Sequence, residues 1–317
     1  MSISRISNKV SRMSPIIVES KLLNNVMNNY RKPTKIDFVS DLHIEMWDPI
    51  YKIKYPCGDI KNYPLNMDIF ERSESRFLIV GGDISDDLEL TIDKLSEISN
   101  FYDKVLFIDG NHEHVNKIPM NYEKKYIQDL VNEKNKTLDN KLHYLSSAPY
   151  KIGSTLIIGK CGWWDYNGWD DKTIKEDTDN YFKDWINVSE ENSSSYCYNC
   201  MLNAKKDYKD LKEILEAYED DNSVENIVIV THTVPLEIFA KKFNMSTIGN
   251  TEICKLLSNS SKINYWLFGH NHTEYNYKLN DVHFISNPRG RPEDEDREIY
   301  NVKTIQIENI LIILKFE

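Results

Sequence analysis

The sequence has no long hydrophobic run. Hydrophobic residues occupy 40% of its 317 positions, yet no apolar stretch reaches the roughly 18 residues that would indicate a membrane-spanning helix. Charged residues make up 28% of the chain, alongside 11 glycines and 10 prolines, which is the composition of an ordinary globular protein and argues against disorder. We therefore expect a soluble, folded protein with no membrane partner.

Cysteine is scarce, and no apolar secretory leader stands at the start of the sequence. Five cysteines in a chain of this size fit a reducing compartment better than a disulfide framework, so the expected location is cytoplasmic. Cys197 and Cys200 form a lone C-x-x-C pair. Because no second pair completes a tetrahedral zinc site, we interpret them as thiols that bind no metal.

Positive charge is also in short supply, since the formal net charge is -11. Such a surface repels the phosphates of nucleic acids, which disfavours a nucleic acid partner but does not exclude one at a local cationic site. The first 32 residues differ, with six lysines and arginines against one acid, Glu19. We interpret residues 1–35 as a basic arm, flexible or forming a short helix, whose serines leave organellar targeting open.

From residue 36 to the end of the chain, at 317, we expect one main domain. Short apolar runs such as 77–80 and 226–230 alternate with longer segments, which is typical of buried strands in an α/β protein, and the C-terminal third is richer in strands. Acidic, Asn-rich and Ser-rich sequence interrupts the pattern at about 166–225, where a helix begins near Cys197. We interpret this segment as a helical, acidic insertion that caps or flanks the main fold.

Polar residues gather where the apolar runs stop. The motifs are D-x-H, G-D, N-H, a histidine after a strand, and G-H-x-H. Their candidate site residues are Asp41, His43, Asp83, Asn111, His112, His232, His270 and His272. Each motif alone is weak, because an Asp-x-His after a strand is usually a turn with a surface imidazole. Together they are strong, because five of the 8 histidines fall in them and ligands of open α/β sheets gather at the carboxyl ends of strands.

The donor types agree with one another. Two carboxylates, four imidazoles and one carboxamide, with no thiolate, favour Mn, Fe or Zn over a structural cysteine site. Seven donors exceed what one ordinary metal site takes. We expect Gly269 to let the backbone bend between the preceding strand and His270 and His272, so that the two imidazoles can diverge.

This order of motifs resembles the calcineurin-like metallophosphoesterase superfamily over roughly residues 36 to 290, and the bacterial-type members more than the classical protein Ser/Thr phosphatases. The resemblance implies a four-layer α/β/β/α sandwich of two mixed sheets flanked by helices, with a dinuclear metal site on loops at the strand ends. It also implies how the donors divide between two divalent ions. One ion would take Asp41, His43, Asp83 and His272, and the other would take Asp83, Asn111, His232 and His270.

The resemblance further implies a hydrolase that acts on phosphate esters, with a metal-bridging hydroxide as nucleophile and His112 as general acid. Two divalent ions bring four positive charges and the two aspartates return two negative ones, so the loaded site attracts phosphate despite the acidic surface. We expect the substrate to be a small or exposed phosphate mono- or diester. Asp86 lies three residues after Asp83, where protein phosphatase relatives place the acid that orients this histidine, and we expect Glu113 to lie behind the metal ligands rather than to be one of them.

Departures from the family's other members narrow the substrate. The chain has neither the arginine of G-D-x-x-D-R-G nor that of G-N-H-E-x-R, which disfavours a phosphoprotein substrate. Trp163 and Trp164 could line a pocket or lie in the core, and Arg289 could meet a phosphate or stabilise a turn. The alternatives that stay open are a nuclease or nucleotide phosphodiesterase of the same fold, and a non-catalytic scaffold. The sequence indicates no oligomeric state.

Overall fold

The computed structural model describes residues 33–47, 65–115, 120–183, 193–241, 243–294 and 300–308. The chain divides into two compact units, one made of Met1–Thr34 and Gln306–Glu317 and the other of Lys35–Ile305. The short helix considered for the basic arm lies outside the described residues. Within them, no helix combines the length and the apolar character needed to cross a membrane.

The first sheet has the strand order β11-β1-β2-β3-β4. Its strands are β1 (Thr34–Val39), β2 (Phe77–Gly81), β3 (Lys104–Ile108), β4 (Leu142–Tyr144) and β11 (Lys303–Ile307). The pairs β1–β2, β2–β3 and β3–β4 are parallel, and Ile79 of β2 lies opposite Phe38 on one side and Leu106 on the other. Central parallel strands are covered on both faces, which explains why they are continuous apolar runs in the sequence.

The second sheet has the strand order β5-β6-β7-β8-β10-β9. Its strands are β5 (Tyr150–Ile152), β6 (Thr155–Lys160), β7 (Asn226–Thr231), β8 (Ile263–Phe268), β9 (Tyr275–Leu279) and β10 (Val282–Ser286). The inner pairs β6–β7, β7–β8 and β8–β10 are parallel, whereas β5 and β9 pair antiparallel at the two edges. The sheet is therefore mixed, as expected.

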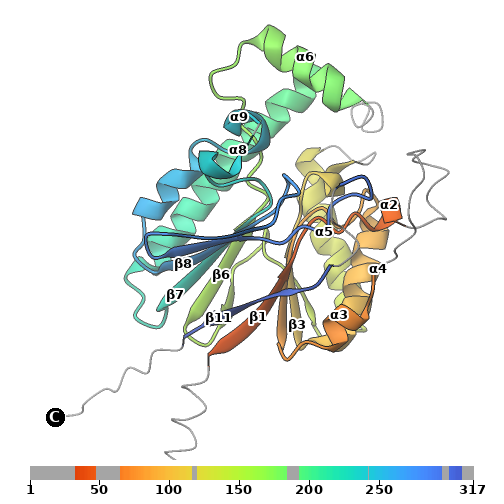
Figure 1. Cartoon of the computed structure of the whole chain (residues 1–317), viewed down its shortest axis with the longest axis vertical. Helices are drawn as coiled ribbons and strands as arrows, with labels where there is room; N and C mark the ends of the chain where they lie inside the picture. Colours follow the sequence, from red (N-terminus) through yellow and green to blue (C-terminus); the bar gives the residue numbers. More distant parts are fainter. Residues whose placement is uncertain are drawn as a thin grey trace, which may run out of the picture. The chain divides into compact units, whose positions relative to one another are not determined.

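Helices cover the outer face of each sheet (Figure 1). The α-helices are α2 (Ile44–Trp47), α3 (Asp68–Glu71), α4 (Leu88–Ile98), α5 (Met120–Asn135), α6 (Asp171–Tyr181), α8 (Ser193–Glu219) and α9 (Met245–Ile248). Short 3-10 turns lie at η2 (Ser99–Phe101), η3 (His112–His114), η4 (Glu237–Phe239) and η5 (Ile253–Ser258). The layers run helix, sheet, sheet, helix, which confirms the α/β/β/α sandwich expected from the sequence.

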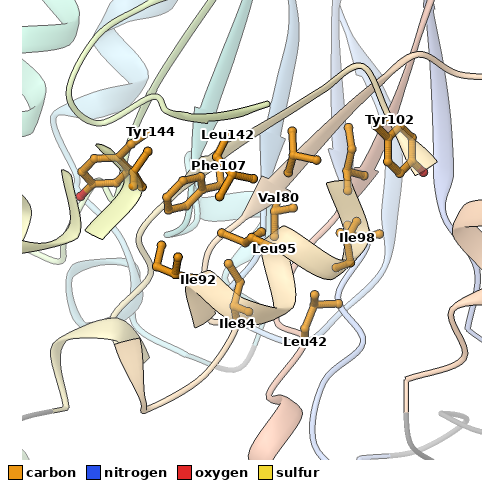
Figure 2. Close-up of a cluster of buried hydrophobic side chains, with 14 of the residues drawn as sticks. Leu42, Val80, Ile84, Ile92, Leu95, Ile98, Tyr102, Phe107, Leu142 and Tyr144 are labelled. Carbon is orange, nitrogen blue, oxygen red and sulfur yellow. The ribbon is translucent and has the colours of Figure 1, made fainter. Parts of the chain in front are cut away.

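The hydrophobic core beside the first sheet joins α4 to the strands. Ile92, Leu95 and Ile98 of α4 are buried with Val80 of β2 and Phe107 of β3 (Figure 2). These α4 residues recur at intervals of three, so one face of the helix meets the sheet. The Asp87 carboxylate accepts a hydrogen bond from the Leu90 amide and caps the start of the helix.

The segment at 166–225 contains α6 and α8. The later part of α8 packs Leu211 and Leu215 into the core of the second sheet, so this helix is the crossover that joins the parallel strands β6 and β7. Its earlier part packs Cys200 and Ala204 into a separate cluster with Trp164. Ile174 of α6 and Cys161, just after the end of β6, belong to the same cluster.

The carboxyl ends of strands from both sheets meet at one edge of the sandwich. The imidazole of His232, just after β7, donates from Nδ1 to the carbonyl oxygen of Gly81 at the end of β2, over 2.8 Å. The amide of Gly269, just after β8, donates to the carbonyl of His232 over 2.9 Å. The sandwich therefore brings together motifs that lie far apart in the sequence.

Candidate metal centre

The backbone at the strand ends adopts an unusual conformation. The φ angles are 49° at Asp41, 41° at His43, 54° at Asp83, 73° at His270 and 48° at His272. Each is in the left-handed region, which costs a non-glycine residue about 1–3 kcal/mol and clusters at functional sites. Five of the seven expected ligands are therefore held in strained conformations that aim their side chains at a common point.

Two glycines allow the carboxylates to approach the backbone closely. A Cβ at Gly110 would lie 2.1 Å from Oδ1 of Asp83, and a Cβ at Gly269 would lie 2.3 Å from Oδ2 of Asp41. The expectation that Gly269 makes the bend after β8 is wrong, because the left-handed residues there are His270 and His272. Gly269 is needed for space beside Asp41 rather than for its backbone freedom.

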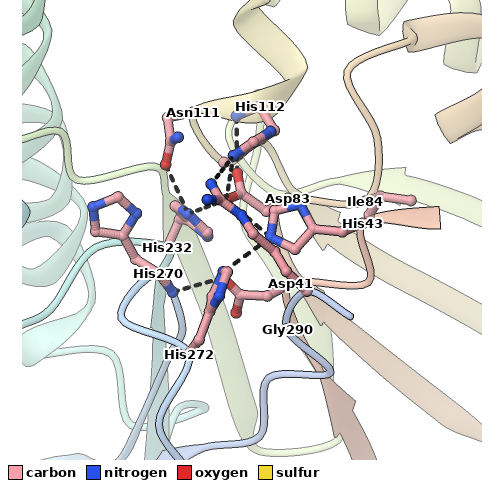
Figure 3. A network of polar contacts seen from close by, with 12 residues as sticks. Asp41, His43, Asp83, Ile84, Asn111, His112, His232, His270, His272 and Gly290 are labelled. Atoms are coloured by element: carbon pink, nitrogen blue, oxygen red, sulfur yellow. Dashed lines mark hydrogen bonds and ion pairs between the residues drawn. The ribbon is translucent and has the colours of Figure 1, made fainter. Parts of the chain in front are cut away.

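The first donor group consists of Asp41, His43, Asp83 and His272, with one ligand atom from each within 4.8 Å of the others. Nε2 of His43 and Nε2 of His272 face each other across 2.9 Å, and Oδ1 of Asp41 lies 3.5 Å from Nε2 of His272 (Figure 3). The other oxygen of Asp41, Oδ2, is buried without a hydrogen-bond partner. A buried carboxylate oxygen and two facing imidazole nitrogens are well suited to share a cation.

The second donor group consists of Asp83, His232 and His270, and Asn111 lies beside it. Nε2 of His232 is 3.1 Å from Oδ2 of Asp83 and 3.0 Å from Oδ1 of Asn111. Because Nδ1 of His232 donates a hydrogen bond to the carbonyl oxygen of Gly81, Nε2 is the nitrogen that remains for a metal. Asp83 belongs to both groups, so the structure brings all seven expected ligands together around one shared carboxylate.

Burial and neighbouring charges set the protonation of these groups. Burial, together with the nearby imidazoles of His112 and His232 respectively, holds the pKa of His43 and of His270 well below the ordinary value. Burial acts the same way on His232, but the carboxylate of Asp83 outweighs it and raises the pKa of His232 to about 10. Burial would raise the pKa of Asp83, yet His232 and His112 keep it well below its usual range. The shared carboxylate is therefore ionised and attracts cations.

His112 lies beside the shared carboxylate. Its backbone amide donates to Oδ1 of Asp83 over 2.9 Å, and its Nε2 lies 3.8 Å from Oδ2 of Asp83. Its Nδ1 contacts Oδ1 of Asp86 at 2.6 Å, which is the contact expected from the sequence. Burial opposes the charged imidazolium, but Asp83 and Asp86 raise the pKa of His112 to about 9. The two carboxylates therefore favour the protonated imidazole, whereas the guanidinium of Arg291 disfavours it.

Glu113 supports the two loops that carry Asp83 and Asn111. Its carboxylate accepts hydrogen bonds from the amides of Asp83 over 3.0 Å, Ile84 over 2.6 Å and Gly110 over 2.6 Å. Burial and the charge of Asp83 raise its pKa to about 7. Because its oxygens face backbone amides, Glu113 ties the ends of β2 and β3 together, and it lies outside the donor groups that could hold a metal.

Three residues whose roles the sequence left open now have defined surroundings. Trp164 is fully buried and stacks on His270, with ring centroids 5.6 Å apart and planes 12° apart, so it is a core residue that supports the imidazole. Trp163 is buried in the same cluster. Arg289 lies over the ring of Trp47 at 4.3 Å and donates to the carbonyl of Leu42 over 3.3 Å, which fits the turn-stabilising interpretation.

Three residues next to the site escaped the sequence analysis. Oδ2 of Asp294 contacts Nδ1 of His272 at 2.7 Å, and Nη2 of Arg291 contacts Nε2 of His112 at 3.2 Å. Glu45, only 3% exposed, has no hydrogen-bond partner for either carboxylate oxygen and lies within 4.8 Å of ligand atoms of His43 and His112. In the sequence, the only sign that Asp294 and Arg291 might matter was the charged stretch that follows Gly290.

Comparisons with known proteins identify the family and the fold of the chain. The model of the calcineurin-like phosphoesterase family matches residues 34–274. A protein of Acanthamoeba polyphaga mimivirus, itself described as uncharacterized, is 23% identical over 298 residues, which cover 87% of this chain and 97% of that protein.

Among solved structures, the phosphopantetheinyl hydrolase of Mycobacterium tuberculosis is similar with a TM-score of 0.58 at 15% identity, covering 87% of this chain and 96% of that one. At this level of identity the likeness concerns the fold. A putative 5'-nucleotidase of Staphylococcus aureus matches more weakly, with a TM-score of 0.45 at 14% identity over 87% of this chain and 55% of that one.

Proposed function

Because the chain belongs to the calcineurin-like phosphoesterase family, whose model covers residues 34–274, we propose that it is a dinuclear metal-dependent phosphoesterase. The observation that carries this proposal is the position of Asp83, which is common to two groups of potential metal ligands. Its carboxylate lies 3.1 Å from Nε2 of His232 and 3.9 Å from Nε2 of His43, one in each group. A shared carboxylate is the feature that a pair of neighbouring ions requires.

The donor set fits two divalent ions of the kind that accept oxygen and imidazole ligands, namely Mn, Fe or Zn. Asp41, His43, Asp83 and His272 would hold one ion, and Asp83, Asn111, His232 and His270 the other. When bound, such ions acidify water to supply the nucleophile and neutralise charge on the phosphoryl group. Nδ1 of His272 contacts Asp294, so its Nε2 is the nitrogen directed at the site.

His112 is the general acid in this proposal. Its Nδ1 contacts the carboxylate of Asp86, which fixes the orientation of the ring and leaves Nε2 to transfer a proton to the leaving oxygen. In the metal-free protein, burial and the guanidinium of Arg291 lower the pKa of His112, but Asp83 and Asp86 raise it to about 9, so the nearby carboxylates favour the protonated ring. The substrate is a small or exposed phosphate ester, because the positive charge of the loaded site attracts a phosphate while the surface is acidic.

The test is to assay the purified chain with Mn²⁺ on p-nitrophenyl phosphate and bis(p-nitrophenyl) phosphate, and to measure its metal content by mass spectrometry. Asp83→Asn should abolish turnover and lower the content of both ions, since one change touches both groups. The matched control is Asp281→Asn on an exposed aspartate, which should change neither. Fewer than two metals per chain together with no turnover of either ester would overturn the proposal.

A further inference from the structure

The guanidinium of Arg291 lies beside Nε2 of His112, and no carboxylate of the described residues forms an ion pair with it. Nη2 of Arg291 is 3.2 Å from Nε2 of His112, and the Nε of the same guanidinium is buried with no hydrogen-bond partner. A half-buried guanidinium with unused donors is costly unless an anion binds there.

The loop that carries Arg291 is anchored to the metal-binding loops. The amide of Gly290 donates to the carbonyl of Asp41 over 2.9 Å, and the indole of Trp47 donates to the carbonyl of Gly290 over 2.9 Å. The amide of Arg291 donates to Oδ2 of Asp294 over 2.7 Å, and the same oxygen contacts Nδ1 of His272 at 2.7 Å. The position of the guanidinium is therefore coupled to Asp41 and His272 rather than left to a free surface loop.

Two cationic or proton-donating groups that meet at one point indicate an anion with several oxygens. His112 can direct its Nε2 at a leaving oxygen, while the planar fork of Arg291 matches a second, terminal oxygen of the same phosphoryl group. A phosphate monoester carries an additional terminal oxygen and more negative charge than a diester, in which that oxygen bears a second organic group. A guanidinium with no ion-pair partner among the described residues favours the more highly charged monoester.

We propose that Arg291 binds a terminal oxygen of the substrate phosphoryl group and makes the site selective for phosphate monoesters. This inference rests on the proposed phosphoesterase function. Arg291 reaches the substrate from the segment after β10, whereas the ligands and His112 come from the ends of β1, β2, β3, β7 and β8. Selectivity is thus carried by a residue outside all of the metal-binding motifs.

The test compares the wild type with Arg291→Ala and Arg291→Lys. The lysine variant keeps the positive charge but loses the planar arrangement of N–H donors of the guanidinium. Glu293→Gln, an exposed change in the same loop, is the matched control. With Mn²⁺ bound, Arg291→Ala should lower kcat/KM for p-nitrophenyl phosphate by about 10- to 100-fold, which is the range for losing hydrogen bonds to a charged group, and Arg291→Lys by less. The loss on bis(p-nitrophenyl) phosphate should be only a few-fold.

A second readout avoids turnover altogether. Calorimetry with inorganic phosphate on the Mn²⁺-loaded protein should show weaker binding in Arg291→Ala and unchanged binding in Glu293→Gln. If the wild type hydrolyses neither ester, the phosphoesterase function itself fails. If the wild type is active but prefers the diester, or Arg291→Ala affects both esters equally, or phosphate affinity is unchanged, the function stands and the role of Arg291 is overturned. Thermal unfolding of each variant verifies that it is folded.

Discussion

Nδ1 of His112 and Oδ1 of Asp86 are 2.6 Å apart, and both side chains are buried beside the shared carboxylate of Asp83. The contact links a residue on the turn after β3 to one on the turn after β2. It orients the imidazole so that its other nitrogen faces the site. Asp86 is therefore a positioning residue that acts through His112, and its removal should resemble a weaker form of removing His112.

We expect His112→Ala to lower kcat by about 10²- to 10⁴-fold while two metals remain bound, because in the proposed mechanism His112 supplies a proton and lies outside the two donor groups that share Asp83. Asp86→Asn should cost about 10- to 100-fold. Both losses should be larger on phenyl phosphate than on p-nitrophenyl phosphate, since nitrophenolate is a weaker base and needs less protonation. Steady-state kinetics on the two esters measures this difference.

A double variant tests whether the two residues act as one unit. His112→Ala combined with Asp86→Asn should be no slower than His112→Ala alone, because Asp86 has nothing left to position. Asp281→Asn is again the control for an aspartate far from this contact. If the losses in kcat are additive in the double variant, or if the loss is equal on phenyl phosphate and p-nitrophenyl phosphate, then Asp86 acts in some other way.

Glu113 should matter for metal affinity although it lies outside the donor groups. Replacement by glutamine removes an acceptor from the amides of Asp83, Ile84 and Gly110, so buried donors on two loops lose partners. We expect the free energy of unfolding to fall by about 1–3 kcal/mol and metal affinity to fall roughly 10- to 100-fold. Chemical denaturation and metal titration measure the two effects.

The control for Glu113→Gln is Glu237→Gln, the same change on an exposed residue. It should leave both stability and metal affinity within error of the wild type. If Glu113→Gln lowers stability without weakening metal binding, then the backbone of the two loops is held in place by other contacts, and the supporting role assigned to Glu113 is wrong.

The metal-free protein should lose stability in mildly alkaline solution. The ordinary pKa of histidine is about 6.5, and although burial opposes the charge, Asp83 and Asp86 raise the pKa of His112 to about 9 in the folded state. A raised folded-state pKa stabilises the protein fully below about pH 6.5, and this contribution is lost as the pH rises through about 9. The free energy of unfolding should fall over that interval.

The comparison that isolates this effect is Asp86→Asn in the presence of a chelator. His232 contributes to the same alkaline loss, so the difference between wild type and variant is the quantity to follow. That difference should shrink between pH 6.5 and 9, by no more than about 2–3 kcal/mol. Parallel stability curves for the two proteins over this range would contradict the assignment of the shift to Asp86.

Much of the site was accessible from the sequence because its signals are local. Asp41 and His43 follow β1 within four residues, and His270 and His272 follow β8 in the same way, so strand, turn and ligand are read together. Parallel strands end at a common edge, which is why motifs after several strands could be expected to converge. The alternation of apolar runs indicated an α/β protein, and the layers of the sandwich were implied by the resemblance.

Other features needed the tertiary structure because they depend on contacts between distant segments. His112 and Arg291 are separated by 179 positions, and nothing near either residue distinguishes Arg291 from its neighbour Arg289. Only the fold places one guanidinium on Trp47 and the other beside the imidazole. The reason for Gly269 likewise lies in Oδ2 of Asp41, on a different strand end.

The sequence by itself therefore predicted which residues could bind metal, since residue type and position after a strand are local properties. The tertiary structure decided which charges surround those atoms. Burial and the approach of Asp83, Asp86 and Arg291 set the protonation and surroundings of His112, and these depend on distances of a few ångströms that no local pattern encodes.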